Sequence, residues 1–271
     1  MTIHPTARVE DGAVVGEGTS IGPYCIVGPH VVIGANCNLI AGVYVTAKTT
    51  IGDDCTIYPS VSLGTPPQSL GHRGELTRLE IGEGCTIREQ STMNAGTVAG
   101  GGVTRVGERG YFMNCSHIGH DCHVGNDVMF GNSATLGGHC EVGDFVSMGD
   151  LSAAHQFVRI GQNTMVGAIS CVRGDVIPFG LATGQSACLA GLNISGMKRC
   201  AFTLARLAIM RSFYQKLFHG AGLFAECLND VRHLAETDPA IAEILTFIDA
   251  ERHRALCLPA AGGGPQAVYH G

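Results

Sequence analysis

The sequence contains no tryptophan, and aromatic and charged residues make up only 6% and 15% of it. No apolar run approaches the ~20 residues that a transmembrane helix needs. The formal net charge is −6, so the chain lacks the excess of cations with which proteins hold nucleic acid through its phosphates. These absences exclude a helical membrane protein and a nucleic-acid binder of that kind, and we expect no stable membrane insertion.

The beginning of the chain, residues 1–5, has neither a basic segment nor an apolar signal segment, so we expect a cytoplasmic protein. The chain has 12 cysteines but no CxxC pair. In a reducing compartment, free cysteine behaves as a small buried apolar residue. We therefore expect six of them to fill the core rather than form disulfides or a zinc site: Cys25, Cys37, Cys55, Cys85, Cys122 and Cys140.

What the sequence does contain is an aliphatic residue at every sixth position. All 26 positions of this hexad are apolar, where the overall 45% of apolar residues would give about 12. The positions are Ile3, Val9, Val15, Ile21, Val27, Ile33, Leu39, Val45, Ile51, Ile57, Leu63, Ile81, Ile87, Met93, Val106, Phe112, Ile118, Val124, Phe130, Leu136, Val142, Met148, Ala154, Ile160, Val166 and Val172. A fixed short period of this kind predicts a stacked repeat.

The hexad predicts a parallel β-helix. Three hexads would close one triangular coil, with the aliphatic residue and a small residue pointing inward from each short strand. The position after the aliphatic residue is usually glycine, which we expect to occupy a turn with positive φ. The period alone leaves the hand of the helix open.

Two breaks interrupt the hexad and predict external loops, near residues 64–78 and 94–104. Because loops carried by a rigid scaffold are common places for function, we expect at least one of them to contact substrate. The predicted organisation is a β-helix over residues 1–190, a helical region over 191–258 and a disordered tail over 259–271.

In the helical region, apolar residues at steps of three and four predict a helix over 197–219, with Phe202, Ala205, Ile209, Phe213 and Leu217 on its buried face. A second helix is expected to start at Asp238-Pro239. The first helix is basic, which suits either a solvated face or an acidic partner. Its cations are Lys198, Arg199, Arg206, Arg211 and Lys216.

The densest set of titratable residues is 115–123. Because Ile118 and Cys122 belong to the inward pattern, we expect His117, His120, Asp121 and His123 to face outward. Adding one coil of three hexads places His139 beside Asp121 and Gly138 beside His120. Two coils on from His120 lies Gln156, with His155 next to it.

This arrangement suits acyl transfer to a hydroxyl. A neutral His120 could take a proton from the hydroxyl, and Asp121 could hold the tautomer of that imidazole. The backbone N–H of Gly138 could stabilise an oxyanion. Zinc binding is the alternative, since outward histidines of a trimeric β-helix hold zinc in the gamma-class carbonic anhydrases.

Four motifs together resemble the acyl-[acyl carrier protein]–UDP-N-acetylglucosamine O-acyltransferases, which begin lipid A synthesis. They are His117-Ile118-Gly119-His120-Asp121-Cys122, Asn132-Ser133-Ala134-Thr135-Leu136-Gly137-Gly138-His139, His155-Gln156-Phe157 and Gly191-Leu192-Asn193-Ile194-Ser195-Gly196-Met197-Lys198-Arg199. The resemblance covers nearly the whole chain. It implies a left-handed β-helix, a homotrimer with active sites between protomers, and no metal or other cofactor.

The resemblance also implies roles for individual residues. His120 becomes the general base for the glucosamine 3-hydroxyl, and the Gly138 amide the oxyanion donor. The basic helix would meet acyl carrier protein. Substrate-binding positions are Gln68, Ser69, His117, His139, His155, Gln156, Asn193 and Arg199, and acyl-groove positions are Ala168 and Ser186.

Some positions differ from the family pattern. Family members carry Asp and Lys at the positions of Ser69 and Gly71, and His-Arg at Asn94-Ala95. The acceptor is therefore either the 3-hydroxyl or a 3-amino group. Ala168 and Ser186 replace Gly and His, so the acyl chain length is open. A related N-acyltransferase of the same pathway usually carries an extra N-terminal domain that this sequence lacks.

Overall fold

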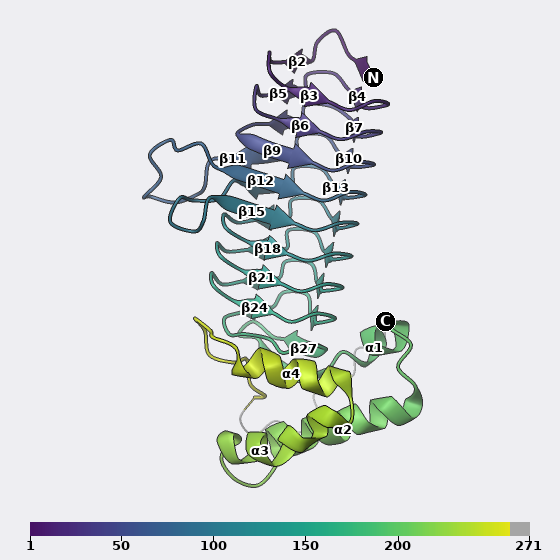
Figure 1. The fold of residues 1–271 in the computed structure, drawn as a ribbon, viewed down its shortest axis with the longest axis vertical. Helices are drawn as coiled ribbons and strands as arrows, with labels where there is room; N and C mark the ends of the chain where they lie inside the picture. The colour runs from purple at the N-terminus through teal and green to yellow at the C-terminus, as the bar shows by residue number, and fades with distance from the viewer. Residues whose placement is uncertain (261–271) are drawn as a thin grey trace.

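The computed structural model describes residues 1–260, so residues 261–271 of the predicted tail lie outside the described part. Short strands form three sheets that run along a prism, and helices lie at its C-terminal end (Figure 1). All strand pairs but one are parallel; the exception joins the last two strands. The fold is the predicted left-handed parallel β-helix with a helical C-terminal part.

Sheet A has 11 strands: β1 (Thr2–Ile3), β4 (Ser20–Ile21), β7 (Asn38–Leu39), β10 (Thr56–Ile57), β13 (Thr86–Ile87), β16 (Tyr111–Phe112), β19 (Met129–Phe130), β22 (Ser147–Met148), β25 (Met165–Val166), β27 (Gly180–Thr183) and β28 (Cys188–Leu192). Sheet B has nine: β2 (Arg8–Val9), β5 (Ile26–Val27), β8 (Tyr44–Val45), β11 (Ser62–Thr65), β14 (Thr92–Asn94), β17 (His117–Ile118), β20 (Thr135–Leu136), β23 (Ala153–Ala154) and β26 (Cys171–Val172). Sheet C has eight: β3 (Val14–Val15), β6 (Val32–Ile33), β9 (Lys48–Ile51), β12 (Arg78–Ile81), β15 (Val103–Val106), β18 (His123–Val124), β21 (Glu141–Val142) and β24 (Arg159–Ile160).

Each coil visits sheets A, B and C in turn, and a residue pairs with the equivalent residue of the next coil. In sheet B, for example, Ile118 pairs with Leu136 and Leu136 with Ala154. The turn from a sheet B strand to the next sheet C strand is the B–C corner. Residues at one corner of successive coils therefore form a column along the prism.

The hexad residues form the core. Of the 26 positions, 23 are 5% exposed or less. The other three, Ile3, Val9 and Val15, belong to the first coil, which has a neighbouring coil on one side only. The six cysteines expected in the core are each at most 1% exposed, and all 12 cysteines are free thiols.

The expected reason for the hexad glycines was wrong. The left-handed conformation belongs to the third residue after the aliphatic one, for example Asn36, Asp121 and His139 with φ of 54°, 60° and 62°. The glycine directly after the aliphatic residue is required by close packing instead. A Cβ on Gly52 would lie 2.6 Å from the Glu83 amide nitrogen, on the following coil.

Both interruptions of the hexad fall at the B–C corner. The step from Leu63 to Ile81 covers three hexads, and the step from Met93 to Val106 covers two hexads and one extra residue, where a single hexad is the rule. Ile51, Ile81 and Val106 nevertheless pair in register across sheet C. The two loops project from the prism at neighbouring coils (Figure 1).

The helices are α1 (Ile194–Arg199), α2 (Leu204–His219), α3 (Phe224–Val231), the 3-10 helix η1 (Arg232–Glu236) and α4 (Pro239–Asp249). The single helix predicted over 197–219 is thus two helices, because Ala201 has φ of 59° and Thr203 caps α2. Its buried face also differs. Leu207, Met210, Phe213, Tyr214 and Leu217 are buried, whereas Ala205 and Ile209 are exposed.

Two buried carboxylates hold the helical part together and to the prism. Asp175, fully buried, accepts from Arg159 Nε at 2.8 Å, and Arg159 also donates to the Phe247 carbonyl oxygen in α4. Asp238 caps α4 and accepts two hydrogen bonds from Arg206 of α2. Arg206, one of the cations of the predicted basic helix, is therefore already paired with a carboxylate of this chain.

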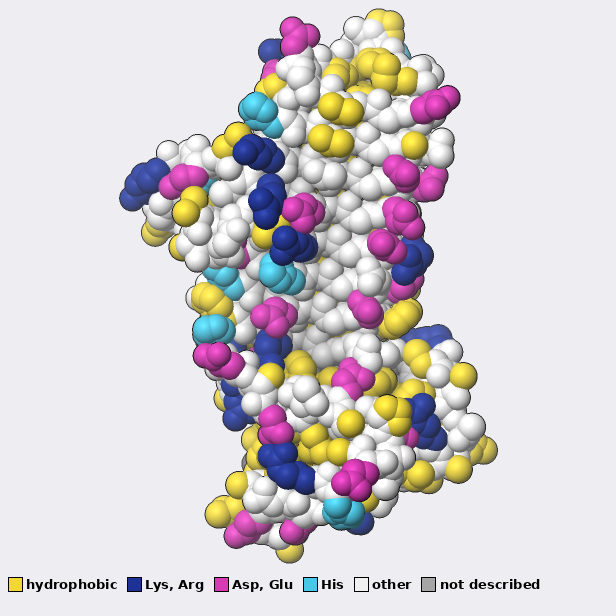
Figure 2. All heavy atoms as spheres, viewed as in Figure 1, with side chains coloured by type: hydrophobic (Ala, Val, Ile, Leu, Met, Phe, Trp, Pro, Cys, Tyr) yellow, Lys and Arg dark blue, Asp and Glu magenta, His cyan; other side chains and the backbone are white. Residues whose placement is uncertain are grey.

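On the surface, charged side chains form two columns along the prism, one over the strands of sheet C beside the loops and one, mostly acidic, along the opposite edge, with an uncharged band between them (Figure 2). Arg78 and Arg105 of sheet C both pair with Glu80, at 2.9 Å. His123 lies on the same sheet, in β18, away from the B–C corner. In the described part of the chain, no helix combines the length and the apolarity needed to span a bilayer.

Candidate active site

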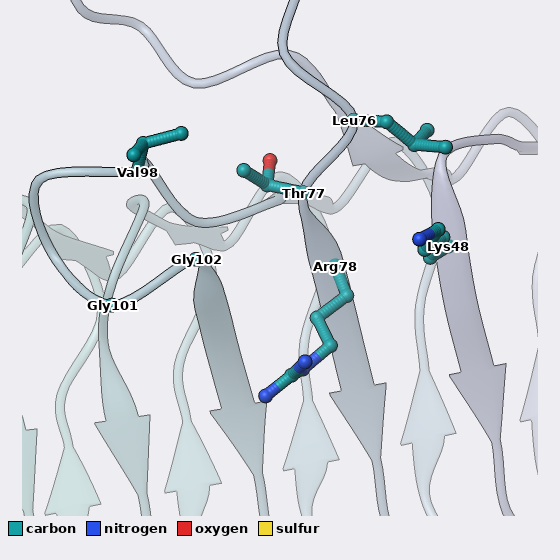
Figure 3. A pocket seen from close by; sticks show the side chains of 7 residues that line it. All are labelled: Lys48, Leu76, Thr77, Arg78, Val98, Gly101 and Gly102. Atoms are coloured by element: carbon teal, nitrogen blue, oxygen red, sulfur yellow. The ribbon is translucent and has the colours of Figure 1, made fainter.

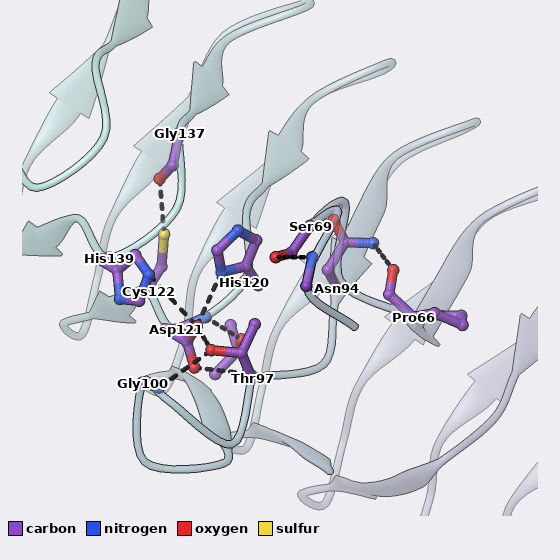
Figure 4. Close-up of polar contacts among 12 residues, drawn as sticks. Pro66, Ser69, Asn94, Thr97, Gly100, His120, Asp121, Cys122, Gly137 and His139 are labelled. Carbon is purple, nitrogen blue, oxygen red and sulfur yellow. Dashed lines mark hydrogen bonds and ion pairs between the residues drawn. The ribbon is translucent and has the colours of Figure 1, made fainter. Parts of the chain in front are cut away.

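The B–C corner of the coil at residues 119–122 carries an imidazole and a carboxylate in direct contact. His120 Nδ1 lies 2.8 Å from Asp121 Oδ2 (Figure 4). Because a carboxylate accepts hydrogen bonds, the His120 proton sits on Nδ1 and the lone pair on Nε2 is left to accept a proton. The two adjacent residues reach each other because Asp121 adopts the left-handed conformation, with φ of 60°.

Asp121 faces outward from the prism as expected, but only 1% of its side chain is exposed to solvent. The second loop covers it. The backbone N–H of Thr97 donates to Asp121 Oδ1 and the Thr97 hydroxyl to Oδ2, both at 2.7 Å. Thr104 Oγ1 accepts from the Asp121 N–H at 2.8 Å. The loop thus fixes the carboxylate that orients His120.

His139 completes the cluster one coil further on. Its ring packs edge-on against the His120 ring, with centroids 5.0 Å apart, and its Nε2 lies 3.6 Å from Asp121 Oδ2. Phe157 stacks on the other side of His139 at 4.5 Å, and His253 contacts Phe157 at 5.3 Å. Burial lowers the pKa of His139, which favours a neutral ring beside the base.

His117 lies in β17, before the corner. Its Nδ1 is 2.7 Å from the Thr92 hydroxyl oxygen, and burial lowers the pKa of its imidazole. His117 is therefore a neutral polar group of the wall rather than a second charged site.

Gly138 lies against the His120 ring, as the coil period predicts. A Cβ on Gly138 would be 2.6 Å from His120 Cε1 and 2.8 Å from Nε2, so only glycine leaves room for this imidazole. Among the residues that the structure describes, the Gly138 N–H donates to no backbone or side-chain acceptor.

The same turn in other hexads shows what this amide can bind. The amides of Ala35, Asn126 and Asn132 donate to the carboxylates of Asp53, Asp144 and Asp150, at 2.6 to 2.7 Å. Each carboxylate comes from the equivalent position of the next coil. The residue one coil after Gly138 is Gln156, which has no carboxylate. The Gly138 amide, whose equivalents in those three hexads bind a carboxylate oxygen, is therefore open beside His120.

His155 and Gln156 occupy the next B–C corner and are exposed. His155 Nδ1 is 2.7 Å from Arg254 Nη2, and Arg254 Nε donates to the Gln156 carbonyl oxygen at 2.9 Å. The C-terminal segment therefore reaches the predicted site.

The loop residues lie toward the N-terminal side of His120 (Figure 4). Ser69 accepts from the Gly71 N–H at 3.3 Å, and Gln68 is exposed. Asn94, in β14, donates through Nδ2 to Thr65 Oγ1 and to the Pro66 carbonyl oxygen. A cleft of about 300 Å³ lies between the loops, lined by Lys48, Leu76, Thr77, Arg78, Val98, Gly101 and Gly102 (Figure 3).

Four predicted residues do not join His120 within one protomer. Asn193 is buried and caps α1, accepting from the Gly196 N–H and donating to the Asn163 carbonyl oxygen. Arg199 is exposed at the end of α1, Ala168 is exposed at the turn between sheets A and B, and Ser186 is exposed between β27 and β28.

Cys122, next to Asp121, is a poor nucleophile. Cys122 points into the core, donates to the Gly137 carbonyl oxygen at 3.1 Å, and burial raises the pKa of its thiol well above the usual range. Cys115 is exposed at the turn between sheets A and B of the same coil and contacts Gln90.

His120, Asp121 and His139 offer ligand atoms within 4.8 Å of one another. Asp121 already accepts three hydrogen bonds. Oδ1 accepts from the Thr97 N–H, and Oδ2 accepts from the Thr97 hydroxyl and from His120 Nδ1. Three hydrogen bonds to about four acceptor sites suit a carboxylate that orients an imidazole better than one that binds a metal.

Sequence reasoning missed Thr97, Phe157, His253 and Arg254. Phe157 could have been found, because it lies one coil after His139. Thr97 lies in a loop without period, and Arg254 is 98 residues from Gln156, so neither carried a signal.

Known proteins resemble this chain over nearly its full length. A family profile described as Udp N-acetylglucosamine O-acyltransferase, domain 2, matches residues 175–257, and one for the bacterial transferase hexapeptide of six repeats matches residues 1–35. Acyl-[acyl-carrier-protein]–UDP-N-acetylglucosamine O-acyltransferases of Sinorhizobium fredii and Rhizobium johnstonii are 43% and 45% identical to it. Each match covers 96% of this chain, and 97% and 96% of the respective relative.

The solved structure of the UDP-N-acetylglucosamine O-acyltransferase from Moraxella catarrhalis has a TM-score of 0.91 against this chain at 38% identity. That match covers 95% of this chain and all of the other. Because these relatives match nearly the full length of the chain and the solved structure shares its fold, the chain belongs to the acyl-[acyl-carrier-protein]–UDP-N-acetylglucosamine O-acyltransferase family.

Proposed function

We propose that this protein transfers a 3-hydroxyacyl chain from acyl carrier protein to the glucosamine 3-position of UDP-N-acetylglucosamine, the first step of lipid A synthesis. Two relatives whose names give O-acyl transfer from acyl carrier protein to UDP-N-acetylglucosamine are 43% and 45% identical over 96% of the chain. Both substrates are expected in the cytoplasm, where we place the protein.

The reaction needs a base and an anion stabiliser, and no side-chain nucleophile. His120 Nε2 takes the proton of the sugar 3-hydroxyl as its oxygen attacks the thioester carbonyl carbon. Asp121 stabilises the imidazolium that forms. The Gly138 N–H donates to the oxyanion of the tetrahedral intermediate. When the carbon–sulfur bond breaks, the imidazolium returns its proton to the departing thiolate.

One observation carries the proposal most directly: the open amide of Gly138 next to the His120 ring. The equivalent amides at Ala35, Asn126 and Asn132 bind carboxylate oxygens. An amide of this geometry therefore suits a negatively charged oxygen, and at Gly138 the place is left for the substrate.

Substrate positioning follows the same corner. His117, His139, His155 and Gln156 would line a substrate cleft along the B–C corner, and Gln68 and Ser69 would approach the sugar from the first loop. Asn193 and Arg199 would lie near the nucleotide, and Ala168 and Ser186 along the acyl chain. These four lie away from the B–C corner of their own protomer, so we propose a homotrimer in which adjacent protomers complete each site.

The acceptor group is the main alternative. Asn94 Oδ1 is buried and has no donor among the described residues, and Ser69, Gly71 and Ala95 carry no charge. A 3-amino sugar nucleotide is therefore a second candidate acceptor, with the same base and the same oxyanion donor.

The test is acyl transfer from a panel of 3-hydroxyacyl carrier proteins to UDP-N-acetylglucosamine and to its 3-amino analogue, with a metal chelator present. We expect transfer to one of these sugars and a loss of at least about a hundredfold in His120→Ala. Inactivity toward both sugars, or loss of activity with chelator, would reject the proposal and favour the zinc alternative.

A further inference from the structure

Residues 252–258, the C-terminal strap, run back from α4 to the last coils of the prism (Figure 1, yellow). Hydrogen bonds anchor the strap on the C-terminal side of Arg254. The Asp175 N–H donates to the Ala255 carbonyl oxygen, and the Cys257 N–H to the Asp175 carbonyl oxygen, both at 2.8 Å. The Leu189 N–H donates to the Leu258 carbonyl oxygen at 3.0 Å. The position of Arg254 is therefore set by the prism itself.

Arg254 contacts the B–C corner at two points. Its Nη2 lies 2.7 Å from His155 Nδ1, and its Nε donates to the Gln156 carbonyl oxygen at 2.9 Å. That carbonyl oxygen also lies 3.4 Å from His155 Nδ1, a longer and weaker contact than the one from Arg254. A guanidinium has five N–H donors and no acceptor. His155 Nδ1 must therefore accept, which leaves a neutral imidazole with its proton on Nε2.

His120 and His155 thus have opposite tautomers. Asp121 accepts from Nδ1 of His120, so Nε2 of that ring is an acceptor. Arg254 donates to Nδ1 of His155, so Nε2 of this ring is a donor. One corner of the prism therefore presents a proton acceptor and, two coils on, a proton donor.

The column around His155 leaves its ring accessible. Gly119 and Gly137 occupy the equivalent position in the two preceding coils, and neither has a side chain to cover it. His155 is exposed, and the Cys140 thiol donates to its carbonyl oxygen at 3.2 Å. A ligand lying along the corner toward His120 can reach the Nε2–H.

We propose that Arg254 is a positioning residue that holds His155 as an Nε2–H donor toward an acceptor oxygen of the sugar nucleotide. The role in turnover rests on the proposed acyl transfer, whereas the tautomer does not. The neighbouring His253 contacts Phe157, which stacks on His139, so the strap supports the cluster at a second point.

The first test is spectroscopic. Solid-state ¹⁵N spectra of the full-length protein, labelled at its histidine rings, report which nitrogen carries the proton, and His155→Gln identifies the signal. We expect protonated Nε2 and bare Nδ1 in wild type, and a mixture of tautomers in Arg254→Gln. Arg254→Lys should keep the wild-type tautomer, because an ammonium also only donates. A protonated Nδ1 in wild type, or no change in Arg254→Gln, would overturn the assignment.

The second test is kinetic. Arg254→Gln should reduce kcat/KM for the sugar nucleotide roughly 10- to 100-fold, as expected for a misplaced binding group. Arg254→Lys should recover part of the loss. Arg252→Gln is the matched control, since it removes the same charge from an exposed neighbour, and it should remain within about twofold of wild type.

The double variant decides whether Arg254 acts through His155. If it does, Arg254→Gln adds little to the loss caused by His155→Gln. Multiplying losses would refute the positioning role. A loss confined to KM for acyl carrier protein would also refute it, because the acceptor oxygen would then belong to the acyl donor. If wild type has the expected tautomer but transfers no acyl group, the proposed function fails and the assignment of His155 stands.

Discussion

At the scale of single residues, the proposed chemistry depends on the missing side chain of Gly138. Gly138→Ala would place a methyl group 2.6 Å from His120 Cε1. We expect the imidazole to turn away from Asp121 as a result. We expect kcat to fall by about a hundredfold or more, since a displacement near 1 Å is costly in an active site. Steady-state kinetics measure this. An alanine variant with wild-type kcat would show that His120 does not act against the Gly138 amide.

Thr97 is the residue that ties the second loop to the catalytic pair. Thr97→Val keeps the shape but removes the hydroxyl that donates to Asp121 Oδ2 at 2.7 Å. A hydrogen bond to a charged group contributes about 1.5–3 kcal/mol, so we expect kcat to fall at least roughly tenfold. Thr97→Ser, which retains the hydroxyl, is the control. Equal activity of the valine and serine variants would mean that Asp121 holds its place without the loop.

The partly buried His117 and His139 give stability a pH dependence. Burial lowers the pKa of both His117 and His139 below the ordinary 6.5. Below pH 6.5 the unfolded chain therefore binds protons that the folded chain does not. Stability should be complete above that pH and fall as pH drops toward the lower folded pKa values. Urea unfolding between pH 5 and 7.5 measures this, and His117→Gln with His139→Gln should flatten the decline; an unchanged slope would contradict it.

At the scale of secondary-structure elements, Asp238 joins α2 to α4. It caps α4 by accepting from the Ala240 N–H, and it pairs with Arg206. Arg206 lowers the pKa of this carboxyl, so its contribution is present above about pH 4 and is lost as pH falls below that. Asp238→Ala should reduce the free energy of unfolding by about 2–4 kcal/mol at neutral pH.

The exposed pair Arg232 and Asp249 supplies the comparison for that measurement. Their side chains are 45% and 46% exposed, and exposed pairs contribute only about 0–1 kcal/mol. Asp249→Ala should therefore stay within about 1 kcal/mol of wild type in the same denaturant titration. Similar losses in the two variants would show that burial and capping add nothing at Asp238.

At this scale, the positions within the coils could be predicted from the sequence, whereas the contacts made by the loops and helices could not. A strict period predicted that Ile118 and Leu136 point inward, and so that His120 lies beside Gly138 and Asp121 beside His139. The burial of Asp121 was missed, because Thr97 covers it from a loop that has no period. The inward face of α2 was missed as well. Leu207 and Met210 face inward in place of Ala205 and Ile209, and the contact of Arg206 with Asp238, 32 residues away, left no periodic signal.

At the scale of the whole molecule, the proposed trimer predicts complementation between inactive protomers. His120→Ala alters the B–C corner and Arg199→Ala alters the end of α1, and we expect each variant alone to be inactive. In trimers assembled from an equal mixture, about a quarter of the sites would combine an intact His120 with an intact Arg199 from the neighbour. Activity near that fraction supports shared sites, while absence of recovery would place both residues in one protomer.

Both loops leave the prism at one corner, and the strands on either side stay in register. The loops can therefore change in length and sequence, whereas the hexads of the prism cannot. A longer loop costs only about 0.6 kcal/mol for each doubling of its length, whereas a residue inserted in a hexad would turn every later side chain to the wrong face. Evolution or engineering can therefore change residues 64–78 and 94–104, which we propose to contact the acceptor, without altering the scaffold that holds His120.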